Sequence, residues 1–222
     1  MDSLTPGHCS GPGRPNGHRD FYALVSYIPD PLGTYLNNLR ADLISGCRLR
    51  SHVTLLPPRM LRAESPRLVE ELASRLSRLA PFEIALGEIE VFETTGVIYV
   101  AIERGWKQLQ EFHSVLEEGI FWFEEYYPFH PHLTLAQGVE GQAFEATLDR
   151  ARESWSRCPY SRTFLVEDLT FVRNVDPNRW DTISEHRLVR GGGGAIPPGT
   201  EKSAPIPAGV GEPFSPQQPP TR

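Results

Sequence analysis

The chain has 222 residues and a formal net charge of −6, with 22 Lys and Arg against 28 Asp and Glu. This acidic balance argues against an extended nucleic-acid surface, which needs a basic track along the phosphate backbone. A small nucleotide, a short oligonucleotide or a nucleic-acid terminus stays open as a partner. No stretch approaches the roughly 18 apolar residues of a membrane span, and the start of the chain has no apolar signal segment. We therefore expect a cytoplasmic protein without membrane association.

The two ends of the chain differ in composition from the middle. Residues 1–18 are rich in Gly, Pro, Ser and His, and residues 191–222 open with a run of glycines and continue as a proline-dense stretch. Such segments bury too little apolar area to offset the entropy of ordering, so we expect two disordered tails. Residues 19–190 are expected to form one two-lobed domain, and we expect a monomer.

Strands and helices alternate at the start of this domain. The apolar residues 21–28 predict a buried strand, and Asp30-Pro31 predicts the start of a helix that runs to about residue 45. The next predicted strand covers residues 52–56. Pro57 and Pro58 should end this strand, because proline cannot donate a ladder hydrogen bond.

A helix and a hairpin are predicted next. Ser65-Pro66 is typical of a helix start, and leucines at positions 68, 72, 76 and 79 form an apolar stripe at helical spacing. Residues 82–92 and 97–102 predict two strands, joined by a turn that ends at Gly96. The first half therefore reads as a mixture of helices and antiparallel strands.

The second half follows a similar order. Residues 106–116 predict a helix with Trp106, Leu109, Phe112 and Leu116 on one face. An aromatic-rich segment then leads to a predicted strand over residues 132–136 and a helix over residues 144–155. The last elements are predicted as one strand pair, residues 162–173 and 181–189, and Trp180 should pack against this sheet.

One four-residue pattern occurs twice, as His52-Val53-Thr54-Leu55 and as His132-Leu133-Thr134-Leu135. In a strand, residues i and i+2 point to the same face, so each copy places an imidazole and a hydroxyl side by side. Helices and strands surround the two copies in similar order. We predict an α+β fold of two pseudo-symmetric lobes, each an antiparallel sheet with flanking helices, around a central cleft that carries both motifs.

Two imidazoles and two hydroxyls suit the opening of a cyclic phosphodiester. One histidine can take a proton from water while the other protonates the departing oxygen, and the threonines can donate hydrogen bonds to the phosphate. This chemistry needs neither a metal nor another cofactor. A lone histidine on a strand is more often structural, but the matched pair favours a site. The sequence does not say whether His52 or His132 is the acid.

The two motifs resemble the paired HxTx motifs of the two-histidine (2H) phosphoesterase superfamily. Together with residues 19–23 and 129–135, they make the chain most similar to the bacterial and archaeal 2′-5′ RNA ligase / RNA 2′,3′-cyclic phosphodiesterase group. The resemblance covers residues 19–190. It implies metal-free hydrolysis of a cyclic nucleotide or RNA-terminal phosphate, with both histidines and both threonines in the site. The reverse reaction, 2′-5′ RNA ligation, and a non-catalytic module that binds nucleotides or RNA ends remain alternatives.

The chain departs from this group after the second motif. Many relatives carry a basic residue there, and this chain has Gln137 and Gly138. Arg59, after the first motif, could compensate by contacting phosphate, or it could be a solvated loop arginine. Tyr127 and Phe129 could stack on a nucleobase, or they could pack as part of the wall. Gln137 is a further candidate for substrate binding.

A metal site is the remaining alternative at the second motif. His130 and His132 lie two residues apart, so they could hold a metal from one strand face. No acidic or cysteine partner has a recognised spacing from them, so we expect no metal site. His130 is then a flanking surface residue, and Glu124-Glu125 is a solvated pair.

Overall fold

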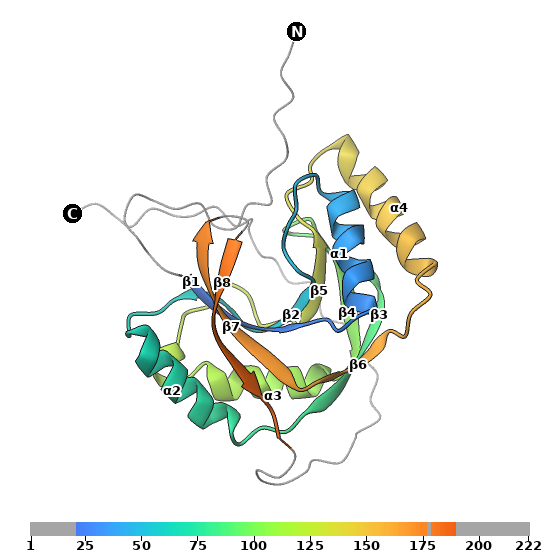
Figure 1. Cartoon of the computed structure of the whole chain (residues 1–222). Helices are drawn as coiled ribbons and strands as arrows, with labels where there is room; N and C mark the ends of the chain where they lie inside the picture. Colours follow the sequence, from blue (N-terminus) through green and yellow to red (C-terminus); the bar gives the residue numbers. More distant parts are fainter. Residues whose placement is uncertain (1–20, 177–178, 190–222) are drawn as a thin grey trace, which may run out of the picture.

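The computed structural model describes residues 21–176 and 179–189 (Figure 1). The predicted tails, residues 1–18 and 191–222, lie outside the described residues. The elements in chain order are β1 (Phe21–Tyr27), α1 (Leu32–Leu43), β2 (His52–Met60), α2 (Ser65–Leu76), β3 (Phe82–Phe92), β4 (Val97–Arg104), α3 (Trp106–Leu116), a 3-10 turn (Gly119–Phe121), β5 (His132–Ala136), α4 (Gln142–Ser156), β6 (Thr163–Val166), β7 (Asp168–Asp176) and β8 (Arg179–Arg187).

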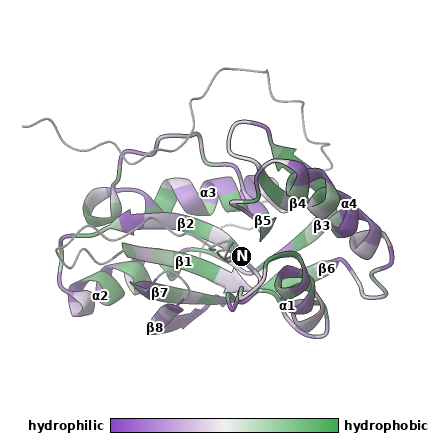
Figure 2. Cartoon of the chain, turned by 90° about the horizontal axis from the view of Figure 1, so that it is seen from above, coloured by the Kyte–Doolittle hydropathy of each residue, from purple (hydrophilic) through white to green (hydrophobic). Residues whose placement is uncertain are grey.

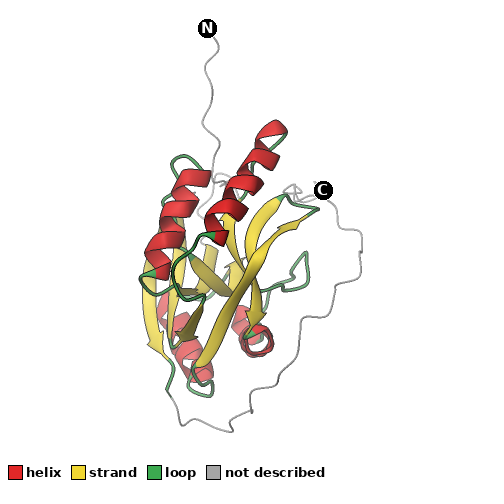
Figure 3. Ribbon diagram, turned by 90° about the vertical axis from the view of Figure 1, so that its right-hand side faces the viewer, coloured by secondary structure: helices red, strands yellow, loops and turns green. Residues whose placement is uncertain are grey.

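The strands form two antiparallel sheets, one in the order β2-β1-β7-β8 and the other in the order β5-β4-β3-β6. Helix α2 contacts β8 and α3 contacts β2, whereas α1 contacts β5 and α4 contacts β3. The helices therefore lie in two pairs outside the strands (Figure 3). We call the first sheet with α2 and α3 the first lobe, and the second sheet with α1 and α4 the second lobe. This arrangement confirms the predicted α+β fold with two similar lobes.

The lobes are not the two halves of the sequence, because the chain crosses between them. Strands β3 and β4 join the second sheet, β6 also belongs there, and β7 and β8 return to the first. The prediction of one strand over residues 162–173 was therefore wrong. Strand β6 ends at Val166 and pairs with β3, whereas β7 begins at Asp168 and pairs with β1, so the chain passes from one sheet to the other at Glu167. The alternation of buried residues in β6 gives way to four consecutive buried residues, Leu169 to Val172, in β7.

The sequence predicted that the first motif strand ends at the prolines, but the strand in the structure is longer. Strand β2 continues through Pro57 and Pro58 to Met60. It is an edge strand, where a missing N–H on the outer side breaks no ladder bond. The register also shifts within this stretch: Leu24 pairs with Leu56, but Tyr22 pairs with Arg59. Three steps along β2 face two along β1, which is the signature of a bulge that accommodates the prolines.

The helices bury the residues that their spacing predicts, with one exception. Leu68, Leu72 and Leu76 of α2 are buried, so the leucine stripe is confirmed. In α3 the expected face is buried except for Trp106, which is 37% exposed. The buried polar residue of that face is His113.

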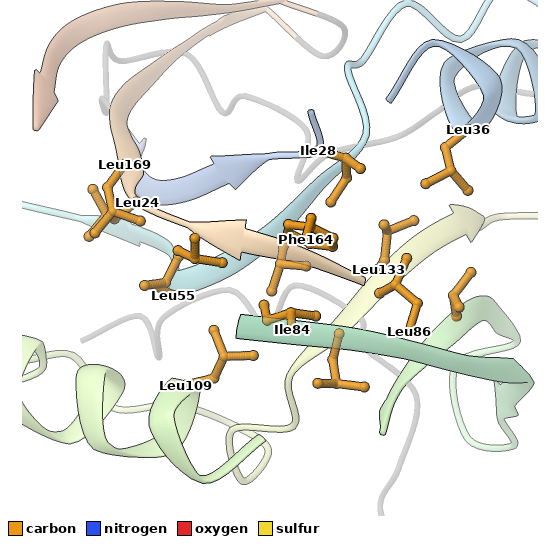
Figure 4. Packing of buried hydrophobic residues seen from close by; sticks show 14 of the residues in the cluster. Leu24, Ile28, Leu36, Leu55, Ile84, Leu86, Leu109, Leu133, Phe164 and Leu169 are labelled. Atoms are coloured by element: carbon orange, nitrogen blue, oxygen red, sulfur yellow. The ribbon is translucent and has the colours of Figure 1, made fainter. Parts of the chain in front are cut away.

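One apolar core joins the two lobes. Leu24 and Leu55 of the first lobe belong to the same buried cluster as Ile84 and Leu133 of the second (Figure 4). Figure 2 shows the hydrophobic stretch of β1 and the hydrophilic surface of α4. Trp180 packs against a small cluster on the first sheet, as predicted. Within the described ranges, no helix is long and apolar enough to span a membrane.

Candidate active site

The two motifs occupy equivalent places at the edges of the two sheets. His52 to Leu55 begin β2 and His132 to Leu135 begin β5, and these two edge strands contact each other. Valine and leucine side chains at the alternate positions are at most 1% exposed, whereas the histidines and threonines are partly exposed. The buried face thus fixes the direction of the polar face in both copies. In each copy the histidine and the threonine therefore lie on one face of the strand, as the sequence predicted, and both strands are edge strands.

Each imidazole is held by the same local hydrogen bond. His52 Nδ1 lies 2.7 Å from the carbonyl oxygen of Arg50, and His132 Nδ1 lies 2.7 Å from the carbonyl oxygen of His130. A carbonyl oxygen only accepts, so Nδ1 carries the proton and donates it in both cases. In the neutral ring the lone pair is then on Nε2. Both rings are thereby oriented in the tautomer that a general base requires.

Both histidines are neutral in the free protein at neutral pH. Burial lowers the pKa of His52 to about 4, and the positive charge of Arg40 acts in the same direction, as does His132 when it is protonated, against the opposing hydrogen bond to Arg50. Burial likewise lowers the pKa of His132 to about 4, with His130 acting in the same direction. The electrostatic coupling of His52 to His132 agrees with the contact between their strands. At neutral pH a proton on either ring is therefore unfavourable unless a nearby negative charge stabilises it.

Aromatic rings surround the second histidine more closely than the first. The His132 ring packs edge-on against Phe92, with centroids 4.9 Å apart, and lies 5.3 Å from Tyr99. Tyr99 donates a hydrogen bond of 2.9 Å to Glu90, and burial together with Glu90 raises the pKa of Tyr99. The sequence reading missed Phe92 and Tyr99. Only the strand register, which pairs Tyr99 with Thr134, brings them to the site.

The two threonine hydroxyls are available for a ligand. Thr54 and Thr134 are partly exposed. Neither side chain forms a hydrogen bond within residues 21–176 and 179–189. Each hydroxyl lies on the same strand face as its histidine, so a group bound between the two motifs could accept a hydrogen bond from both.

Arg59 is neither a solvated loop arginine nor positioned to contact phosphate. Its side chain is 0% exposed and forms an ion pair with Glu125. The guanidinium also donates to the carbonyl oxygens of Pro57 and Phe121, at 3.0 and 2.9 Å. The reason is the extension of β2, which carries Arg59 into the interior. Glu125 is only 17% exposed, so the prediction of a solvated glutamate pair was wrong for this residue.

His113 belongs to a cluster of ionisable side chains that the sequence reading missed. Its Nδ1 lies 3.0 Å from the carbonyl oxygen of Leu55, and its Nε2 lies 3.0 Å from Glu117 and 3.4 Å from Glu125. The three ligand atoms of His113, Glu117 and Glu125 are close enough together to hold a metal ion. However, Arg59 already compensates Glu125, which makes an ion-pair network the simpler description. Among the described residues the geometry groups these three, and not His130 with His132.

The remaining candidates lie after α3 and after β5. The Phe129 ring stacks on His113 with centroids 3.8 Å apart, so one ring face is occupied and the residue acts as wall packing. Tyr127 is 37% exposed and stays a candidate for base stacking. Gln137 follows β5 and is partly exposed, and its role in substrate binding stays a prediction. The central cleft also stays a prediction.

A family model and the similar known proteins point to the same family. Residues 29–178 match the family described as the 2'-5' RNA ligase superfamily. A protein of Oceanobacillus iheyensis named as a candidate phosphoesterase is 34% identical over 106 residues, which span 44% of this chain and 62% of that relative. A similarly named protein of Staphylococcus aureus is 24% identical over 144 residues, or 64% of this chain and 82% of the relative.

Solved structures show the same fold. Escherichia coli LigT in apo form matches with a TM-score of 0.55 at 14% identity, over 78% of this chain and 100% of LigT. LigT complexed with 3'-AMP matches with a TM-score of 0.55 at 16% identity and the same coverage. The family match spans more than half of the sequence, so the chain belongs to the 2'-5' RNA ligase superfamily of two-histidine phosphoesterases.

Proposed function

We propose that the protein is a metal-independent phosphoesterase that hydrolyses a 2′,3′-cyclic phosphate to a 2′-phosphate. One observation carries this proposal: His52 and His132 lie on contacting edge strands, and the same Nδ1 hydrogen bond directs each lone pair to Nε2. Membership in a superfamily of phosphoesterases and ligases supports activity on phosphate esters. The proposed catalytic residues are His52 and His132, and Thr54 and Thr134 are the proposed phosphate-binding residues.

The proposed reaction balances without a cofactor. One neutral imidazole removes a proton from water, and the resulting oxygen attacks phosphorus. The bond from phosphorus to the 3′ oxygen breaks, and the other imidazole, protonated, gives its proton to that oxygen. The products are a 2′-phosphate and a 3′-hydroxyl. The threonine hydroxyls donate hydrogen bonds to the non-bridging oxygens, on which charge builds in the transition state.

The substrate class is a cyclic nucleotide or the cyclic-phosphate end of RNA. The LigT structures were obtained with 3'-AMP and ATP, so relatives of this fold bind nucleotides. The net charge of −6 disfavours a long RNA track, because phosphate contacts along a backbone require many basic residues. Partly exposed Tyr127 is the candidate for stacking on the base.

The proposal is tested by hydrolysis of 2′,3′-cyclic nucleotides and of cyclic-phosphate-ended RNA in EDTA, over about pH 5 to 9. Wild type is compared with His52→Ala and His132→Ala, and with His186→Ala on β8 as the control. We expect a 2′-phosphate product, loss of rate in both motif variants and no loss in the control. Activity that EDTA abolishes, or motif variants that retain full rate, would contradict the proposed mechanism.

The pH dependence tests the order of events. The pKa of each motif histidine is about 4 in the free protein, so little imidazolium is present at neutral pH. A bound anionic phosphate raises the pKa of an adjacent imidazole. We therefore expect kcat/KM, which reports the free protein, to peak at lower pH than kcat, which reports the complex. Coincident peaks would contradict protonation on binding.

The reverse reaction is the second candidate function. A site that opens a cyclic phosphate can also join it to a 5′-hydroxyl and form a 2′-5′ link, and the superfamily carries the name of that activity. Incubation of cyclic-phosphate-ended RNA with a 5′-hydroxyl RNA tests it directly. A module that only binds nucleotides would instead show a change in affinity, without turnover, when either histidine is replaced.

A further inference from the structure

Arg40 is a buried cation without a counter-ion among the described residues. It lies on α1, and its side chain belongs to the buried face of that helix, 5% exposed. Nη2 lies 3.9 Å from Cys47 Sγ, whereas Nε and Nη1 have no hydrogen-bond partner in the part of the chain that the structure describes. No carboxylate within those residues forms an ion pair with it. Because a buried charge without a partner is costly, an anion that binds near Arg40 gains from it.

The position of Arg40 is beside the first motif. Asn37, one turn earlier on the same helix, accepts a hydrogen bond of 2.6 Å from the backbone N–H of Ser51. Ser51 directly precedes His52, and its buried hydroxyl also has no partner among the described residues. The charge of Arg40 acts on the imidazole of His52 and lowers its pKa. Two unsatisfied polar groups, one of them cationic, thus lie next to the proposed catalytic histidine.

The corresponding position in the other half of the molecule is paired. The buried residues Leu36, Leu39, Arg40 and Leu43 of α1 have the same spacing as Leu109, Phe112, His113 and Leu116 of α3. Each of these helices precedes a motif strand. His113 lies beside two carboxylates, whereas no carboxylate in the described part of the chain pairs with Arg40. The fold therefore allows an ionisable side chain at this helix position to have carboxylate partners. The burial of Arg40 without such partners needs another explanation.

We propose that Arg40 balances the negative charge of the substrate's phosphate in this site. This inference rests on the proposed function. In this role Arg40 provides the positive charge that neither of two other positions provides. Gln137 stands where many relatives have a basic residue, and Arg59 is paired with Glu125. The nitrogens of Arg40 are shielded from solvent, so it acts through its electrostatic field as a positioning residue. It is not a catalytic residue.

The first test is binding of inorganic phosphate, measured by isothermal titration, together with thermal unfolding of the free protein. Arg40→Met keeps the length of the side chain and removes the charge, and Arg40→Lys keeps the charge. Arg157→Met is the matched control, because Arg157 is the first residue after α4 and its side chain is 74% exposed. We expect phosphate binding to weaken roughly 10-fold in Arg40→Met, to be largely retained in Arg40→Lys and to be unchanged in the control.

Thermal unfolding separates this role from a structural one. Removal of an unpaired buried charge should leave the Tm of free Arg40→Met equal to or above that of wild type. A Tm several degrees lower would assign Arg40 to the stability of α1 and overturn the proposal. Phosphate binding by Arg40→Met as tight as by wild type, or no phosphate binding by wild type at all, would overturn it too.

Kinetics on the cyclic nucleotide keep the two proposals distinct. The groups that face His52 besides Arg40 are His132, Tyr27 and the backbone of Arg50, and the substitution leaves them in place. Loss of Arg40 should therefore raise the pKa of His52 and move the acid limb of kcat/KM to higher pH, with Arg40→Lys restoring it. If turnover depends on both histidines but the acid limb does not shift, the role of Arg40 is rejected and the proposed function is not. No turnover in wild type would reject the proposed function.

Discussion

The two motif strands are alike on their polar faces and unlike in what lies behind them. His52 and His132 share the same hydrogen bond, the same partial burial and the same lowered pKa of about 4. Behind β2, His113 of α3 approaches the Leu55 carbonyl and is paired with glutamates. Helix α1, which contacts β5, instead places the unpaired Arg40 at the same helical position.

This difference shows that the polar faces of the two motif strands and the helix positions behind them are under different constraints. The proposed chemistry requires both edges to present a histidine and a hydroxyl in the same way, which fits the matching polar faces. The helix positions carry no such requirement and can differ: His113 lies beside two carboxylates, whereas Arg40 forms no ion pair among the described residues. The same substitution at Arg59 and at Arg40 can therefore distinguish a buried arginine that stabilises the fold from one that serves the site.

The largest expected effect tests the equivalence of the two edges. His52→Ala and His132→Ala should each lower kcat/KM for a 2′,3′-cyclic nucleotide by roughly 10²–10⁴-fold, because each removes one proton-transfer group. The double variant should lose little more than either single variant, since groups that act as a unit are not additive. Multiplicative losses in steady-state kinetics would show that the two histidines act independently.

The next effect contrasts two buried arginines. Arg59→Met should lower the free energy of unfolding by about 3 kcal/mol, because it leaves Glu125 buried beside the site of the lost charge. The same substitution at Arg40 should not lower it. Urea denaturation of both variants measures the difference, and the folded fraction of Arg59→Met should turn over substrate at nearly the wild-type rate. Equal destabilisation would remove the distinction between a paired and an unpaired cation.

The sequence predicted the parts of this molecule that depend on local periodicity. Alternation placed His52 and Thr54 on one strand face, and leucine spacing gave the buried side of α2. The burial of Arg59 was not predictable in this way, because it depends on an edge strand that tolerates two prolines. The split between β6 and β7 depends on which strand each of them pairs with, which local periodicity does not give.

Arg40 also left a signal that the sequence reading did not use. It lies four residues after Leu36 and three before Leu43, so helical spacing places it on the apolar stripe of α1. A cation on such a stripe must be paired or must serve a ligand. Its partner, or the absence of one, could be established only from the three-dimensional contacts. The charged network around His113 likewise joins segments that are far apart in the sequence.

A smaller effect is expected at the threonines. Thr54→Val and Thr134→Val keep the shape of the side chain and remove one hydrogen-bond donor each. Loss of a donor to the developing negative charge should lower kcat by roughly 10²-fold, with thermal unfolding unchanged. If only one of the two variants loses rate, the phosphate lies nearer to one edge, and the symmetry of the polar faces does not extend to the bound substrate. The comparison of the two kcat values decides this.

The pH dependence of stability follows from the same two pKa values. The ordinary histidine pKa is 6.5, and in the folded protein those of His52 and His132 are lowered to about 4. Between these values the unfolded chain binds more protons, so the free energy of unfolding falls as the pH is lowered from 6.5 toward 4. His52→Gln and His132→Gln should each flatten this slope in urea denaturation at several pH values, while Thr54→Val, which removes no titrating group, keeps it. The slope that remains comes in part from His130 and His186, whose pKa values burial also lowers. If both glutamine variants kept the wild-type slope, the motif histidines would titrate normally, and the argument that a bound phosphate must supply the protonated imidazole would fail with it.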